Sequence, residues 1–168
     1  MKVVIKNYVA LFILAGWVFH LNSCVKAPDF PLEPEIDFVG FSKSTMNQGG
    51  LNNDSTFMTI SFQDGDGDIG HPANSTMRSL FIIDKRTGNI YNQFKVPEIP
   101  EQGVGNGVRG EITVLMYTTC CIFPDLIPPC SAPSQFPTND LSFEVYLVDR
   151  AGNESNRINT GIINLLCN

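Results

Sequence analysis

The sequence predicts an all-β fold: a single antiparallel β-sandwich of the immunoglobulin-like type, with about seven strands. Apolar and polar residues alternate within short segments, which is the pattern of half-buried strands. Glycine, asparagine and proline separate these segments, and none of them has the 3.6-residue period of a helix. With 168 residues, the chain is long enough for one domain with a hydrophobic core and short for two.

Seven segments have the length and composition of strands. The segment 141–148 (LSFEVYLV) alternates most clearly, with an apolar residue at every second position. The segments 79–84 and 89–94 flank KRTG, so we expect a hairpin in which Gly88 adopts a positive φ. The predicted strands are 36–41, 56–62, 79–84, 89–94, 111–117, 141–148 and 160–166.

The N-terminus has the pattern of a bacterial export signal. Lys2 and Lys6 precede an uncharged apolar stretch, 8–19, which is shorter than the ~20 residues that span a bilayer. The stretch ends in LNSC, which resembles a lipobox, the sequence that precedes a lipid-modified cysteine. We therefore predict lipidation at Cys24. The alternative is an ordinary secretory signal with an incidental cysteine.

This interpretation divides the chain into a lipoprotein signal peptide (1–23), the lipidated cysteine with a proline-rich tether (24–35) and the sandwich domain (36–168). Removal of Lys2 and Lys6 leaves 9 of the 11 basic residues against 17 acidic ones, a net charge of −8. Such a surface repels nucleic acid and anionic headgroups, so nucleic acid is excluded as a partner. We expect membrane attachment through the N-terminal lipid, as an outer-membrane lipoprotein of the cell envelope. Its periplasmic or surface orientation stays open.

Four cysteines follow Cys24: Cys120, Cys121, Cys130 and Cys167. Exported proteins meet an oxidising compartment, so an even number predicts two disulfides. Neighbouring residues of a strand point to opposite faces, and we expect Cys120 and Cys121 to have different partners. One would bond to Cys130 and the other to Cys167, in an order that the sequence leaves open. A zinc site is sterically poor with two adjacent cysteines, and unpaired or vicinally paired cysteines are the remaining alternative.

The stretch SFQDGDGDIG, residues 61–70, places Asp64, Asp66 and Asp68 at every second position with glycines between them. In an extended segment these side chains project to one side, where their carboxylates repel one another. The glycines allow the backbone to bend, so that the carboxylates converge on a cation. Ca²⁺ accepts six to eight oxygens in flexible geometry, and we predict calcium as the cofactor.

The loop does not match the EF-hand pattern, so further ligands must come from elsewhere in the fold. The segment 149–156 (DRAGNESN) is the predicted source, because Asp149 ends a strand and Asn153 belongs to the turn that follows. Loops gather at the ends of a sandwich, and both side chains would lie there. The alternative is that both motifs are only turns, since Asp-Gly repeats and AGN sequences form turns without a metal.

Three motifs together carry a resemblance to a known group of proteins. TISFQDGDGDIG (59–70), YTTCC (117–121) and DRAGNESN (149–156) resemble uncharacterised lipoproteins of Bacteroidota-type bacteria. These share a DGDGDIG loop after an early strand and a D-x-AGN-x-S turn before the last one. The similarity extends from about Pro31 to Cys167. It implies an envelope location and an immunoglobulin-like sandwich, and it implies no activity.

Catalysis is not predicted. The chain has no G-x-S-x-G, H-E-x-x-H or P-loop pattern, and no nucleophile motif accompanies His71. Three aspartates in one short loop also differ from the two acids that a glycosidase places across a cleft. We expect a non-catalytic binding module for a protein or glycan ligand, stabilised by calcium and disulfides. The Pro- and Gly-rich segment 95–110 is a candidate for its binding surface, because long loops in compact domains are often functional; the alternative is a mobile loop with no such role. The alternative is a structural accessory subunit of an outer-membrane complex.

Overall fold

The computed structural model describes residues 30–100 and 107–168, which contain ten strands and no helix. The predicted all-β class is confirmed. The predicted signal peptide and Cys24 lie outside the described residues. In the part that is described, no helix is long and apolar enough to cross a membrane. The strands are β1 (Glu35–Phe41), β2 (Thr45–Asn47), β3 (Ser55–Asp64), β4 (Leu80–Asp84), β5 (Asn89–Phe94), β6 (Val108–Tyr117), β7 (Thr138–Leu141), β8 (Phe143–Leu147), β9 (Ile158–Asn159) and β10 (Ile163–Leu166).

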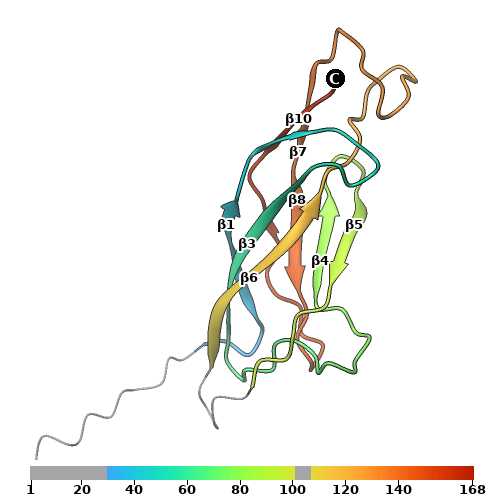
Figure 1. The fold of residues 1–168 in the computed structure, drawn as a ribbon. Coiled ribbons are helices and arrows are strands. Elements are labelled where there is room, and N and C mark those ends of the chain that lie inside the picture. Colours follow the sequence, from blue (N-terminus) through green and yellow to red (C-terminus); the bar gives the residue numbers. More distant parts are fainter. Residues whose placement is uncertain (1–29, 101–106) are drawn as a thin grey trace, which may run out of the picture.

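The strands form three sheets in an elongated molecule (Figure 1). One sheet has the order β1-β3-β6, a second has the order β5-β4-β8-β9, and a smaller one has the order β2-β10-β7. Hydrogen-bonded neighbours are antiparallel, except β2 and β10, which run parallel. This arrangement is compatible with the predicted sandwich, but it has ten strands in three sheets rather than about seven strands, and one of its pairs is parallel. The immunoglobulin-like type stays a prediction.

Buried side chains from all three sheets form one hydrophobic cluster. Every second residue is buried in β3 from Thr56 to Asp64, and in β8 from Phe143 to Leu147. The Tyr91 ring of β5 packs on Phe143 with 4.8 Å between ring centroids. The period-2 alternation of the sequence therefore gives the inward face of each strand.

The observed strands match most of the predicted ones to within a few residues. The hairpin between β4 and β5 forms as predicted, and Gly88 in its turn has a φ of 70°. The predicted strand 141–148 is in fact two strands: β7 ends at Leu141 and pairs with β10, whereas β8 begins at Phe143 and pairs with β4. A strand that passes from one sheet to another forms a corner of the fold. The alternation continues across this corner, so the sequence does not reveal it.

Two disulfides lie at the end of the molecule where β6 and β10 finish (Figure 1). Cys120 is bonded to Cys130 with 4.6 Å between Cα atoms, and Cys121 is bonded to Cys167 with 6.0 Å between Cα atoms. The adjacent cysteines thus have different partners, as predicted. The premise of that prediction is wrong, however, because β6 ends at Tyr117 and both cysteines lie beyond the strand. The structure assigns the order that the sequence left open.

At the other end, the described part of the predicted tether lies against the domain. The backbone N–H of Gly65 donates to the Pro31 carbonyl at 2.7 Å, and Pro34 is buried. β1 then begins at Glu35, one residue before the predicted start of the domain. The chain therefore enters the fold beside the loop that follows β3.

Candidate metal centre

Two strands each place an aspartate at the same end of the core. Asp64 follows Phe62 on the inward face of β3, and its side chain has no exposed surface. Asp149 lies two residues beyond Leu147, the last residue of β8, and is 3% exposed. β3 and β8 belong to different sheets. In both chain segments, the aspartate comes two residues after the last inward-facing apolar residue. The two carboxylates therefore lie at the same end of the hydrophobic core.

The loop after β3 curls back and adds the two other predicted aspartates. Gly67 has a φ of 74° and Gly70 a φ of 81°, in the left-handed region that favours glycine. The backbone N–H of Asp68 donates to Asp64 Oδ2 at 3.0 Å. Ile69 is fully buried and fixes the loop on the core. The curl, rather than an extended backbone, lets carboxylates two residues apart converge.

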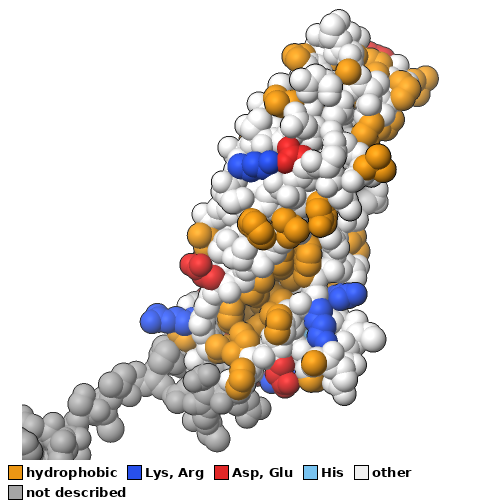
Figure 2. Space-filling view, in the orientation of Figure 1, with side chains coloured by type: hydrophobic (Ala, Val, Ile, Leu, Met, Phe, Trp, Pro, Cys, Tyr) orange, Lys and Arg blue, Asp and Glu red, His pale blue; other side chains and the backbone are white. Residues whose placement is uncertain are grey.

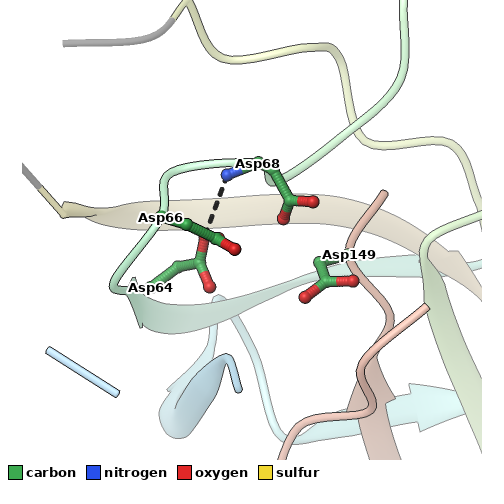
Figure 3. Close-up of side chains that lie close together, drawn as sticks. All are labelled: Asp64, Asp66, Asp68 and Asp149. Atoms are coloured by element: carbon green, nitrogen blue, oxygen red, sulfur yellow. Dashed lines mark hydrogen bonds between the residues drawn. The ribbon is translucent and has the colours of Figure 1, made fainter. Parts of the chain in front are cut away.

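Figure 3 shows the four carboxylates pointing toward a common centre. One carboxylate oxygen from each residue lies within 4.8 Å of the corresponding oxygens of the others, the residues being Asp64, Asp66, Asp68 and Asp149. Ca²⁺ binds oxygens at about 2.4 Å, so ligands on opposite sides of one ion are about 4.8 Å apart. The four oxygens therefore fit around a single ion of this size.

Two oxygens of this group are buried and have no hydrogen-bond partner, namely Asp64 Oδ1 and Asp68 Oδ1. The ion pairs of the described residues include none of the four carboxylates. A buried polar atom without a partner costs about 1–3 kcal/mol, and like charges at this separation repel. A bound cation would satisfy both oxygens and neutralise the repulsion.

The pKa shifts in this group also show that burial and the neighbouring negative charges disfavour ionised carboxylates. Burial, and after it the negative charge of Asp66, raise the pKa of the Asp64 carboxyl from 3.8 to about 7. Burial, and the charges of Asp149 and Asp66, raise the pKa of Asp68. Without a cation, the surroundings thus disfavour the ionised forms of Asp64 and Asp68.

Backbone groups of the segment after β8 hold the loop in place. The N–H of Ala151 donates to Asp68 Oδ2 at 2.9 Å, and the N–H of Arg150 donates to the Asp68 carbonyl at 3.2 Å. The Arg150 guanidinium donates to the carbonyls of Ile69 and Gly70 at 3.4 and 3.2 Å. The sequence analysis did not identify Arg150 and Ala151 as part of the site. The only sequence signal for these two residues is their position within the DRAGN motif. Their contacts to the loop after β3 form because the fold brings the two loops together.

Asn153, which the sequence predicts as a ligand, lies beside Asp149. Its backbone N–H donates to Asp149 Oδ1 and its side-chain amide donates to Asp149 Oδ2, each at 2.8 Å. In this arrangement Asn153 orients the Asp149 carboxylate toward the other three. Its role as a direct ligand stays a prediction.

Only oxygen donors come together at this place, because the group contains no histidine or cysteine. Carboxylate oxygens suit Ca²⁺ and Mg²⁺, whereas copper and structural zinc sites favour nitrogen or sulfur ligands. Comparison with protein-family models, with curated proteins and with solved structures finds no match for this chain. The interpretation of the four carboxylates therefore rests on their geometry alone, and this geometry supports a cation site.

Proposed function

We propose that this chain is a non-catalytic binding module of the bacterial cell envelope. In this proposal an immunoglobulin-like sandwich is anchored through a lipid on Cys24, and Ca²⁺ stiffens the loops at one end. The observation that carries the proposal is the fully buried Asp64 carboxylate, whose Oδ1 has no partner and lies among three other carboxylates. A fold that buries such a group gains stability from a cation at that place.

Calcium is preferred over magnesium because of the number and setting of the ligands. Mg²⁺ requires near-ideal octahedral geometry at about 2.1 Å and retains several waters. Four carboxylates on two separate loops, with Asp64 and Asp149 buried, leave little room for a water shell on the inner side. Ca²⁺ accepts mono- and bidentate carboxylates in irregular arrangements, and additional oxygens from water or backbone complete its shell.

A groove beside β6 supports a binding role. It has a volume of about 750 Å³, and apolar side chains are exposed along it in Figure 2. Its position agrees with the predicted binding surface, because the described parts of the segment 95–110 form part of its wall. Residues that line it include Phe62, Val96, Ile99, Arg109 and Ile112. A groove with apolar walls and a few charged groups suits a protein or glycan ligand.

Binding is favoured over catalysis because of the separation of the carboxylates. The two acids of a glycosidase lie roughly 5 Å or more apart on either side of a substrate cleft. Here the oxygens of four acids lie within 4.8 Å of one another, and two of these acids are buried. That arrangement suits an ion rather than a sugar ring.

The cation is tested by thermal unfolding of the mature domain in calcium and after removal of cations. At a hundredfold excess over Kd, calcium should stabilise the fold by about 2.7 kcal/mol, which corresponds to roughly 10 °C in Tm. The substitution Asp66→Asn should shrink this difference without harming the fold, because Asp66 is exposed. Asp140→Asn is the matched control, since Asp140 is also exposed and lies on β7 outside the cluster. Equal melting with and without calcium in the wild type would refute the site.

The binding role has its own test, with labelled domain titrated onto isolated bacterial envelopes. We expect saturable binding in calcium that is weakened at least tenfold by Ile112→Glu, because a charge in the groove opposes apolar contact. The melting temperature of the variant confirms that it is folded. Binding that does not saturate, or that Ile112→Glu leaves unchanged, would contradict a ligand site in this groove.

A further inference from the structure

The two loops that supply the carboxylates also hold the segment through which the chain enters the domain. We define this entry segment as residues 30–36. The Gly65 N–H, between two of the aspartates, donates to the Pro31 carbonyl at 2.7 Å. The Asn156 side chain, in the segment after Asp149, accepts from the Ile36 N–H at 2.8 Å and donates to the Ile36 carbonyl at 2.9 Å. Both segments that carry the aspartates thus form hydrogen bonds to the entry segment.

The contact at Gly65 is so close that only glycine fits there. A Cβ atom at this position would lie 2.6 Å from the Pro31 carbonyl oxygen and still nearer to that of Phe30. Backbone atoms cannot give way as a flexible side chain can. Gly65 therefore has two roles. It separates the carboxylates of Asp64 and Asp66, and it leaves space for the backbone of the entry segment.

A second contact of the entry segment lies at Gly107, which is also close to Asp64. The Phe30 ring packs over Gly107, where a Cβ atom would lie 2.5 Å from the ring. The same Cβ atom would lie 2.7 Å from the Asp64 carbonyl oxygen. Gly107 leads into β6, which pairs with β3 up to Asp64 and Val108. The entry segment, the first aspartate and the start of β6 therefore meet at one point.

We propose that occupation of the cation site controls the docking of the entry segment on the domain. This inference rests on the proposed cation site and states what the cation regulates. With the cation bound, the loop 64–70 and the segment 149–156 are drawn together, and both contacts to the entry segment are held. Without it, the carboxylates repel, the loop containing Gly65 loosens, and the part of the entry segment that precedes β1, residues 30–34, is released. A domain tethered from its N-terminus then changes between a fixed and a free attachment.

The test measures the mobility of a spin label on the entry segment of the full chain, isolated from its envelope in detergent. Leu32 is 62% exposed, so Leu32→Cys accepts a nitroxide without disturbing the packing. We expect the mobile component of its spectrum to rise at least twofold when calcium is removed. A label at Leu51→Cys is the control, because Leu51 is 91% exposed on a loop next to Cys120, far from the cluster. Its mobility should not respond to calcium.

Two variants separate docking from cation binding. Gly65→Ala should leave the label at position 32 mobile in calcium, because the added Cβ atom displaces the Phe30 and Pro31 carbonyls. Phe30→Ala should also leave the label at position 32 mobile in calcium, and it changes no residue of the loop 64–70. This variant replaces Gly65→Ala as the test if Gly65→Ala fails to fold. For Phe30→Ala we expect the calcium-dependent rise in Tm to remain.

The outcomes are distinguishable. If calcium raises the Tm of the wild type but leaves the label at position 32 unchanged, this inference is wrong and the cation site stands. If calcium changes neither, the proposed cation site fails as well. If the label is still immobilised by calcium in both variants, the contacts at Gly65 and Phe30 are not the link, and the inference is overturned.

Discussion

At the scale of single residues, Asp64 is the group on which the site depends. It occupies an inward position of β3 that an apolar residue would fill, and its Oδ1 has no partner. Replacing it by a hydrophobic residue would extend the core by one layer. The position holds a carboxylate instead, close to Asp149 from the segment after β8, and the proposed ion between them supplies a physical reason for it. Asn153 and Ala151 then fix the orientation of the ligands.

The raised pKa of Asp64 predicts how stability depends on pH in protein stripped of cations. Its folded pKa of about 7 lies above the unfolded value of 3.8. The folded state therefore binds the proton more tightly, and this contribution is complete below pH 3.8 and lost as pH rises through about 7. Between pH 5 and 7 the free energy of unfolding should fall by up to about 1.4 kcal/mol per pH unit. Urea unfolding at several pH values measures this slope.

Saturating calcium should flatten or reverse the slope, because the cation keeps the carboxylate ionised. Asp64→Asn supplies the control, since the amide does not titrate in this range. In cation-free buffer at pH 7.5 this variant should be more stable than the wild type and should lose most of its response to calcium. A wild-type stability that rises between pH 5 and 7 without cations would contradict the buried, unpaired state of Asp64.

At the scale of elements, the strands lead to different features at the two ends of the molecule. β3 and β8 lead into the acidic cluster, whereas β6 and β10 lead into the disulfides. Cys121 is fully buried, and its bond to Cys167 ties the last strand to the segment after β6. Gln48 and Arg86 support this segment, because Gln48 accepts from the Cys121 N–H at 3.0 Å and Arg86 donates to the Cys120 carbonyl at 3.1 Å.

The two disulfides should contribute unequally to stability. On the chain-entropy model, the bond with a sequence separation of 46 stabilises by about 4 kcal/mol and the bond with a separation of 10 by about 2.7 kcal/mol. Cys121 and Cys167 are also buried, so their loss affects packing. The double alanine variant at Cys121 and Cys167 should therefore unfold at lower urea than the variant at Cys120 and Cys130.

Peptide mapping without reduction checks the connectivity first, with partial reduction to separate the two bonds. A Cys120–Cys121 linkage would contradict the structure. The urea midpoints of the two double variants are compared in the same buffer with calcium. Equal midpoints would show that the disulfide that closes the longer loop does not contribute more to stability.

At the scale of the whole molecule, the two ends have different roles. The entry segment and the acidic cluster share one end, and the disulfides lie at the other, separated by the length of β3 (Figure 1). A strand of ten residues spans about 33 Å at 3.3 Å per residue. In a protein anchored through its N-terminus, the cation site would lie near the membrane and the disulfide-bonded loop would point away from it.

Lipidation at Cys24 is the prediction on which this orientation depends. Cells grown with a clickable palmitate analogue should label the wild-type chain, and Cys24→Ala should remove the label and release the chain from the membrane fraction. Lys26→Ala, two residues beyond, is a matched control that should be labelled as the wild type is. Equal labelling of wild type and Cys24→Ala would refute the anchor.

Much of the architecture follows from local pattern alone. Alternation identifies the inward faces of β3, β6 and β8, because a strand with one buried face must repeat every second residue. The hairpin at Gly88 follows from turn chemistry. The DGDGD spacing indicates a cation site, because crowded carboxylates repel without one. Each of these depends on residues close together in the chain.

The tertiary structure decided what depends on residues far apart. The pairing of β2 with β10, the change of sheet at Ser142 and the choice of partner for each adjacent cysteine all require the packed sheets. The burial of Asp64 and its approach to Asp149 require them too, since Asp64 ends β3 whereas Asp149 follows β8 of another sheet, and only the fold brings the two together. A sequence pattern gives the face on which a side chain lies. What lies opposite that face is set by how the whole chain minimises exposed apolar surface and unpaired polar groups.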